Sequence, residues 1–223
     1  MVAILKLLQG QPVEQPETQP SQVRGHSLAK LKVLHAEAEE TARLANLLGR
    51  SGYVGVALPF LGILTIALSV EVKTAPQLVW LLFVGAVAGA MLVAYRKAMK
   101  RPFERPALKD YAKDLSAILL FAGFAWGAGA FLALPAGLPA AAAIAFATLP
   151  ALAVAYLLRD KNALALFLAP ATGLTTVACL LKPFGGWTTA VGVIVAAALV
   201  VAAAYLYERL TGIQSKPAML SLP

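Results

Sequence analysis

The sequence predicts an all-α, polytopic integral membrane protein with six transmembrane helices, preceded by a cytoplasmic amphipathic helix. Of its 223 residues, 60% are hydrophobic and only 13% are charged, whereas a soluble domain is about half apolar and about a quarter charged. The apolar residues gather in six runs, each near the roughly 20 residues that a helix needs to cross a bilayer. The runs lack the alternation that a membrane barrel requires, so helices are expected.

A flexible leader is expected at the N-terminus, over residues 1–26. Its stretch 10–26, GQPVEQPETQPSQVRGH, is rich in Pro, Gln and Glu and has too few apolar residues to support a packed core. The apolar start MVAILKLLQG is too short for the core of a signal peptide, and no small-residue cleavage site follows it. The leader is therefore expected to belong to the mature chain.

A cytoplasmic helix is predicted over residues 27–49. Ser27 is a plausible N-cap, Gly49 is a plausible C-terminal stop, and Glu39 lies four residues before Arg43, the spacing of a favourable helical ion pair. This helix is expected either to pack against the membrane and the chain's own loops or to contact a partner or a second copy. One of its faces has a weak heptad pattern, formed by Leu31, Leu34, Ala38, Thr41, Ala45 and Leu48.

The membrane domain is expected to cover residues 50–210, with a short cytoplasmic tail over 211–223. None of its six apolar runs contains Asp, Glu, Lys, Arg or His. Their connections are short apart from a longer basic loop at 96–114, so no large additional domain is expected. The runs occupy residues 53–70, 78–95, 115–135, 139–158, 163–181 and 188–207.

The distribution of Lys and Arg predicts that both ends of the chain are cytoplasmic. With six spans, 17 of the 19 cations fall on one side of the membrane, and only Lys73 and Lys182 fall on the other. Cytoplasmic loops carry an excess of Lys and Arg, so the side with 17 cations is assigned to the cytoplasm. The same asymmetry accounts for the net charge of +8 without a nucleic-acid partner.

The sequence contains no catalytic or metal-binding motif, and the chain is expected not to be an enzyme. Ion and proton pathways generally use charged side chains inside the membrane, and the six runs have none. No Gly-x-Ser-x-Gly elbow, His-Glu-x-x-His or P-loop occurs. His26 and His35 lie in the N-terminal region without further ligands, and Cys179 is the single cysteine. No catalytic residue, metal or cofactor is therefore predicted.

Two Gly-x-x-x-Gly pairs are candidate helix-packing sites. Gly85 and Gly89 lie in the second run, and Gly123 and Gly127 lie in the third. Small residues at this spacing let two helix backbones approach closely. The pairs are expected to pack within the six-helix bundle or to form the face of an oligomer.

A candidate ligand pocket is expected where Pro170 interrupts the fifth run. A proline frees a backbone carbonyl inside a helix and kinks the helix. The hydroxyls of Thr172, Thr175 and Thr176 follow closely, and Trp126 in the third run is a candidate wall. These hydroxyls either satisfy the freed backbone groups or line a polar pocket for a small apolar or neutral ligand.

The basic loop is a candidate contact for anionic lipid headgroups. Phe103 and Tyr111 are interleaved with its cations, as in segments that lie on a membrane surface. Alternatively, the cations only determine the orientation of the neighbouring spans. The candidate headgroup contacts are Arg96, Lys97, Lys100, Arg101 and Arg105.

The chain resembles, over roughly residues 50–210, the membrane-embedded N-terminal sensor region of some bacterial histidine kinases and diguanylate cyclases. The resemblance rests on LSAILLFAGFAWGAGAFLALP after the basic loop, on AYLLRDKNALALFLAPATGLTTVACLL, and on a last span that ends in YLYERL. Trp126-Gly127 and Pro170 match a Trp-Gly and a Pro that recur in that family. The chain departs from the family after Leu210, where no output domain, phosphorylatable His motif or cyclase signature follows.

The resemblance implies a multi-pass protein of the bacterial inner (cytoplasmic) membrane. The expected function is that of a non-enzymatic sensory or regulatory module in signal transduction, acting through a partner protein. The alternative is an accessory or structural subunit of a larger membrane protein complex, and a small-molecule permease is a third possibility. The expected partners are membrane lipids and either another membrane or cytoplasmic protein or a second copy of the chain.

Overall fold

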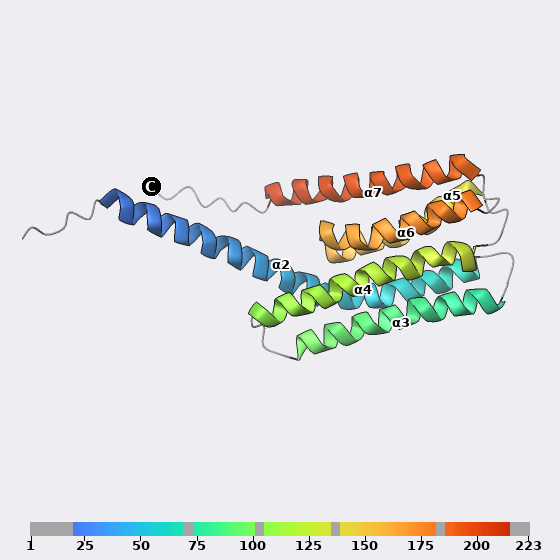
Figure 1. Ribbon diagram of the computed structural model, residues 1–223, viewed down its shortest axis with the longest axis horizontal. Coiled ribbons are helices and arrows are strands. Elements are labelled where there is room, and N and C mark those ends of the chain that lie inside the picture. The colour runs from blue at the N-terminus through green and yellow to red at the C-terminus, as the bar shows by residue number, and fades with distance from the viewer. Residues whose placement is uncertain (1–19, 69–73, 101–104, 135–138, 182–185, 215–223) are drawn as a thin grey trace, which may run out of the picture. The chain divides into compact units, whose positions relative to one another are not determined.

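Every regular element of the computed structural model is an α-helix among the residues that it describes, which are 20–68, 74–100, 105–134, 139–181 and 186–214 (Figure 1). Each of the six helices in this part of the chain contains a segment long and apolar enough to cross a membrane. The predicted all-helical class with six membrane spans is confirmed at this level, whereas the side on which each connection lies stays a prediction. The helices are α2 (Pro20–Ala67), α3 (Thr74–Met99), α4 (Arg105–Leu132), α5 (Ala140–Leu158), α6 (Lys161–Leu181) and α7 (Gly186–Gln214).

The bounds of α2 correct those predicted for the cytoplasmic helix. α2 begins at Pro20 and continues through Ser27 and Gly49 into the first span, so neither of the two residues ends a helix. The residues around Gly49 are mostly strong helix formers, and one glycine inside a helix costs only about 1 kcal/mol relative to Ala. Residues 20–26 of the predicted leader are therefore helical, and residues 1–19 lie outside the described residues.

Two further segments that were predicted to lie outside helices are largely helical. α3 continues to Met99 and α4 begins at Arg105, so most of the predicted loop at 96–114 belongs to these two helices. Lys, Arg, Ala and Met favour a helix, and Pro106 is tolerated because it lies in the first turn of α4, where backbone N–H groups have no helical partner. α7 likewise continues to Gln214, beyond the predicted end of the membrane domain at residue 210.

The chain divides into two compact units, residues 1–42 and 43–223, and α2 contributes to both. This division comes earlier in the chain than the predicted boundary at residue 50. The described part of the first unit is helical, and its Val33 and Leu34 side chains are 57% and 60% exposed. Leu34 belongs to the predicted heptad face, so the described residues leave that part of the face open.

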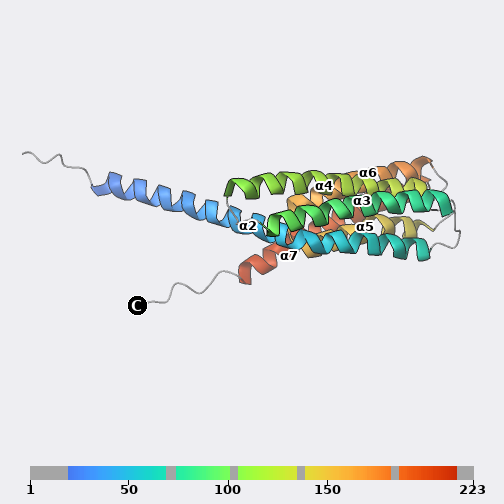
Figure 2. The same cartoon turned by 90° about the horizontal axis from the view of Figure 1, so that it is seen from below.

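The second unit is a helical bundle organised around α4 and α6. α4 packs against α3 and α6, while α7 packs against α5 and α6 (Figures 1 and 2). The part of α2 in this unit lies along α3, where a Cβ at Gly52 or Gly55 would meet the side chain of Tyr95 or Leu92. The bundle therefore uses glycines to bring helix backbones together, as membrane bundles commonly do.

The basic side chains that the structure describes in the bundle lie at one end of it, called here the basic end. α3, α5 and α7 end there, and α4 and α6 begin there (Figure 1). This arrangement agrees with the charge asymmetry from which the orientation was predicted. The exposed cations at this end are Arg96, Lys97 and Lys100 on and after α3, Lys109 and Lys113 on α4, Arg159 and Lys161 at the α5–α6 turn, and Arg209 on α7.

Candidate functional site

The turn between α5 and α6 consists of two residues with distinct roles. Arg159 ends α5 in the left-handed conformation, with φ 52° and ψ 38°, and its N–H donates to the carbonyl of Ala155 at 3.0 Å. Left-handed backbone is unfavourable by about 1–2 kcal/mol for a residue with a Cβ. Asp160 then caps α6, because its Oδ1 accepts hydrogen bonds from the N–H groups of Asn162 and Ala163, both at 3.0 Å. The turn thereby holds the Asp160 carboxylate in a fixed orientation.

The second oxygen of the same carboxylate joins this turn to α2. Arg43 Nε donates to Asp160 Oδ2 at 2.6 Å, and the two side chains are 49% and 5% exposed. Burial alone would raise the pKa of Asp160, but the hydrogen bond from Arg43, its positive charge and the two amide hydrogen bonds together hold that pKa below its ordinary value. Asp160 is therefore an ionised group with defined partners for both of its oxygens.

A polar hollow lies beside this ion pair. Its volume is about 310 Å³, and three arginines, Arg43, Arg50 and Arg159, line it together with Asn46 and Asp160. Three arginines and one carboxylate line the hollow, so it has a positive balance. Guanidinium groups are the side chains best suited to binding phosphate or carboxylate, and the hollow is therefore suited to an anion.

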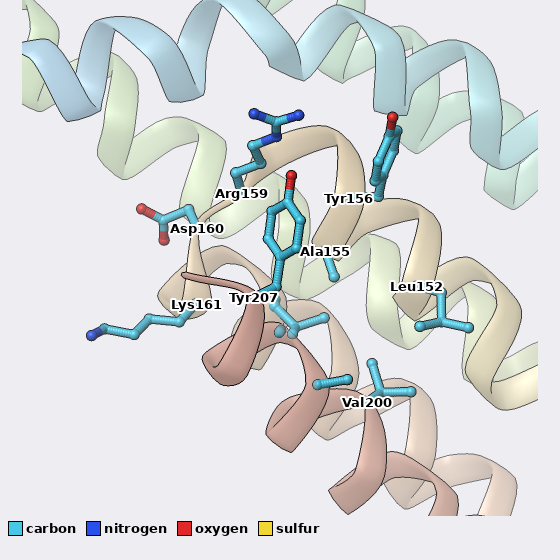
Figure 3. A pocket seen from close by; sticks show the side chains of 11 residues that line it. Leu152, Ala155, Tyr156, Arg159, Asp160, Lys161, Val200 and Tyr207 are labelled. Carbon is cyan, nitrogen blue, oxygen red and sulfur yellow. The ribbon is translucent and has the colours of Figure 1, made fainter. Parts of the chain in front are cut away.

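An apolar cavity lies on the other side of the turn, between α5, α6 and α7 (Figure 3). Its volume is about 330 Å³. Small and aliphatic side chains form its floor, and Arg159, Lys161 and two tyrosines complete its lining. In Figure 3 the Lys161 side chain extends away from Arg159 and the tyrosines. The floor side chains are Leu152, Ala155, Leu164, Val200, Ala203 and Ala204. Asp160 also lines this cavity, so the turn borders both hollows.

Aromatic rings lie beside both cations. The guanidinium carbon of Arg159 lies 5.9 Å from the ring centroid of Tyr156 and 5.8 Å from that of Tyr207, and Figure 3 shows the three side chains close to one another. The ammonium of Lys161 lies 5.9 Å from the ring centroid of Tyr205. These are cation–π distances. The described ion pairs include neither Arg159 nor Lys161.

The five residues of the predicted ligand pocket lie elsewhere, within the α4–α6 contact and on α6. The Thr172 hydroxyl donates to the carbonyl of Leu168 at 2.7 Å, and the Thr175 hydroxyl donates to that of Ala171 at 2.8 Å. Each acceptor is the carbonyl four residues earlier on α6, and neither is the Leu166 carbonyl that Pro170 leaves without its helical N–H, so the predicted repair of the freed backbone group stays a prediction. Pro170 is buried, and Thr176 is partly exposed. None of the five lines either hollow described above, and the pocket stays a prediction.

Trp126 belongs to a packed aromatic cluster in the middle of the bundle. Its Nε1 donates to the carbonyl of Phe146 at 2.8 Å, and Trp80 Nε1 donates to the carbonyl of Ala125 at 3.0 Å. The ring centroid of Trp126 lies 5.3 Å from that of Trp80 and 5.3 Å from that of Phe146. Trp126 is 1% exposed, so it joins α3, α4 and α5 through packing and hydrogen bonds.

The two Gly-x-x-x-Gly pairs have different surroundings. A Cβ at Gly123 would meet the backbone of Phe167, and a Cβ at Gly127 would lie 2.8 Å from Leu174 Cβ, so this pair forms the close contact of α4 with α6. Gly85 and Gly89 are exposed, and a Cβ at either would meet nothing within 4 Å. The first pair therefore packs within the bundle, and the second faces outward from α3.

The candidate headgroup contacts lie at the basic end where the structure describes them. Arg96, Lys97 and Lys100 are exposed at the end of α3. Arg105 is the first residue of α4, and Arg101 lies outside the described residues. Sequence reasoning missed Arg159, Lys161 and the Arg43–Asp160 pair. A signal was present for Asp160, because an Asp directly before an apolar helical run is typical of an N-cap.

The described site consists of cations, one carboxylate, tyrosines and aliphatic side chains. Among the described residues, no group of three or more His, Cys, Asp or Glu side chains could hold a metal ion. No known protein family, curated protein or solved structure matches this chain. The fold and composition define a multi-pass helical membrane protein, and the hollows at its basic end combine cations, tyrosines and an apolar floor.

Proposed function

We propose that this chain is a non-enzymatic sensory or regulatory membrane module that acts through a partner protein. The observation that carries the proposal is the ion pair between Arg43 of α2 and Asp160 at the start of α6. α2 is one continuous helix that contains both a membrane span and the segment before it. A change at the α5–α6 turn therefore bears directly on α2.

The mechanism would be a shift in helix packing that is passed from α5, α6 and α7 to α2. Asp160 is fixed to the turn by two backbone hydrogen bonds, so its carboxylate moves whenever the turn moves. Arg43 would then keep or lose its partner. Breaking a buried ion pair is strongly unfavourable, by several kcal/mol, although the half-exposed Arg43 lowers that value here. The pair would thus distinguish two packing states of the bundle.

The output surface would be the segment of α2 before Arg43. Val33 and Leu34 are exposed there, and exposed apolar side chains on a helix are typical contacts for a partner helix. The proposal places this segment and the basic end in the cytoplasm of a bacterial cell, in keeping with the charge asymmetry and the resemblance to bacterial sensor regions.

The test is extraction of the chain in lipid-preserving particles, followed by mass spectrometry of the proteins that accompany it. A regulatory module should recover a partner in less than equal amounts, and L34Q should reduce that recovery. A36Q is the matched control, because Ala36 is exposed on the same helix without a large apolar side chain. Recovery of the chain without any specific protein, in resting and stimulated cells alike, would count against the proposal.

The second candidate function is that of an accessory subunit in a larger membrane protein complex. The exposed Gly85 and Gly89 favour it, because a Cβ at either would meet nothing within 4 Å and small residues let another helix pack closely. Leu82 and Phe83 are exposed beside it, at 73% and 60%. In the same extraction, a fixed one-to-one partner that is lost in G85L would support this function over the regulatory one.

A further inference from the structure

We propose that the cavity between α5, α6 and α7 binds one anionic phospholipid, with its phosphate at Arg159 and Lys161 and part of an acyl chain on the apolar floor. This site deepens the proposed function by naming its ligand, and only its regulatory meaning rests on that function. Binding itself is a property of the bundle and can be tested without any partner protein.

The shape of the cavity fits part of a lipid. Its volume of about 330 Å³ lies at the lower end of ligand pockets, which span roughly 300–1,000 Å³. A whole phospholipid is larger than such a cavity, so the site would take one chain and the adjoining phosphate. The floor is formed by aliphatic side chains such as Leu152, Leu164 and Val200, which have no polar group to offer a soluble metabolite.

The rim of the cavity selects a negative charge. Arg159 and Lys161 both line it, and neither takes part in the described ion pairs. Figure 3 shows the Lys161 side chain extending away from Arg159, so this flexible side chain would turn toward a phosphate bound at Arg159. Asp160 is the acidic residue of the lining, but its carboxylate is already bound by Arg43 and by two backbone amides. An arginine offers a phosphate several donors at once and a lysine adds a compact charge.

The position of the cavity points to the membrane as the source of the phosphate. Arg159 follows the last residue of one span, and Lys161 begins the next, which is the depth at which lipid headgroups lie. Tyr156 and Tyr207 are 68% and 44% exposed at the rim, and tyrosines are enriched at this depth. Basic pockets between transmembrane helices on the cytoplasmic side are suited to anionic headgroups.

The lipid site touches the ion pair that the proposed function uses. Arg159 and Asp160 line both the apolar cavity and the polar hollow that contains Arg43. A phosphate bound at Arg159 would therefore change the electrostatic surroundings of the Arg43–Asp160 pair directly. Lipid occupancy is in this way linked to the contact between α2 and α6.

The experiment is native mass spectrometry of the purified full chain, titrated with phosphatidylglycerol and, separately, with phosphatidylcholine. The wild-type chain should retain one phosphatidylglycerol in preference to phosphatidylcholine. The double variant R159N/K161Q should weaken that binding by roughly 30-fold, since each cation near an anionic lipid contributes about 1 kcal/mol. Asn is chosen because it tolerates the left-handed backbone at this position.

Two further variants keep the test decisive. K30Q/K32Q removes the same charge from exposed positions on α2, which are not among the candidate headgroup contacts, and should leave the retained lipid unchanged. A203F should fill the floor of the cavity and displace the lipid while both cations remain. Equal loss of phosphatidylglycerol binding in the R159N/K161Q and K30Q/K32Q variants would overturn the proposal in favour of general charge attraction. Complete displacement of phosphatidylglycerol by inorganic phosphate would also overturn the proposal, because it would indicate a site for a soluble anion.

The outcomes for ligand and function are separable. If phosphatidylglycerol does not bind preferentially, the lipid site is wrong, while recovery of a partner in the extraction experiment would still support the regulatory function. If the lipid binds as expected and no partner is recovered, the lipid site is supported and the proposed regulatory function is wrong.

Discussion

Arg43 and Asp160 are 117 residues apart in the chain, yet Arg43 Nε lies 2.6 Å from Asp160 Oδ2. The contact joins α2 to the turn that begins α6. Asp160 is nearly buried, and its other oxygen caps α6. One carboxylate therefore sets both the local geometry of the α5–α6 turn and the position of α2 against it.

Substitutions of Asp160 should separate these two roles. D160N keeps an oxygen for the cap and loses the charge, so it should lower the stability of the chain by about 1 kcal/mol, as expected for a partly exposed ion pair. D160A also removes the cap, which contributes about 0.5–2 kcal/mol more. Thermal unfolding in detergent measures both. Equal melting temperatures for D160N and D160A would show that the cap contributes nothing.

The double variant R43Q/D160N should be less destabilised than the sum of R43Q and D160N, because each single change already removes the same ion pair. Residues in direct contact typically show coupling of about 0.5–3 kcal/mol. The cycle is measured by thermal unfolding under the same conditions. Strict additivity would contradict an energetic link between α2 and the turn.

The pH dependence of stability should follow from the lowered pKa of Asp160. A carboxyl whose pKa is lower in the folded than in the unfolded chain stabilises the fold above its ordinary pKa, which is 3.8 here, and loses this contribution as the pH falls through the folded value. The difference in melting temperature between wild type and D160N should therefore be constant from pH 7 to pH 5. It should shrink only below about pH 4. If this difference in melting temperature already declined between pH 7 and pH 6, the pH dependence would belong to a group other than Asp160.

The two glycine pairs should respond oppositely to an added methyl group. G123A places a Cβ against the backbone of Phe167 and the ring of Pro170, so it should destabilise the isolated chain by about 1–3 kcal/mol through overpacking. G85A meets nothing within 4 Å and should be neutral or slightly stabilising, because Ala favours a helix by about 1 kcal/mol over Gly. The two variants are compared by their melting temperatures in detergent. A similar loss of stability in both would contradict the packing described for α4 and α6.

Trp126 should be sensitive to the loss of one hydrogen bond. W126F keeps an aromatic ring in the cluster with Trp80 and Phe146 but removes the donor to the carbonyl of Phe146. Leaving a buried group unsatisfied costs about 1–3 kcal/mol. T175V is the comparison, since that hydroxyl bonds within its own helix. A smaller loss in W126F than in T175V would contradict the structural role of Trp126.

The sequence was sufficient to predict the six spans, because a bilayer requires long uncharged apolar runs and the chain has six of them. The ends of helices were predicted less well. Ser27 and Gly49 have the residue types of helix ends, yet α2 continues through both. Such signals are local preferences of about 1 kcal/mol, and a long run of helix-forming neighbours outweighs them.

The candidate site was the part that sequence reasoning missed. Arg43 was paired with Glu39 from their spacing, whereas the structure describes its ion pair with Asp160 and places Glu39 3.6 Å from His35. A contact between residues far apart in sequence cannot be read from spacing. The hollows beside the α5–α6 turn arise from how α2, α5, α6 and α7 pack together. This arrangement cannot be predicted from the composition of the chain.

The most direct test of the regulatory account is to compare wild type, D160N and D110N by extraction in lipid-preserving particles and mass spectrometry of the accompanying proteins. Asp110 is exposed on α4, so D110N removes the same charge without breaking the Arg43–Asp160 pair. The account predicts that D160N changes the amount of a substoichiometric partner, while D110N leaves it at the wild-type level. A partner recovered in a fixed ratio from all three chains would contradict the account and establish an accessory subunit.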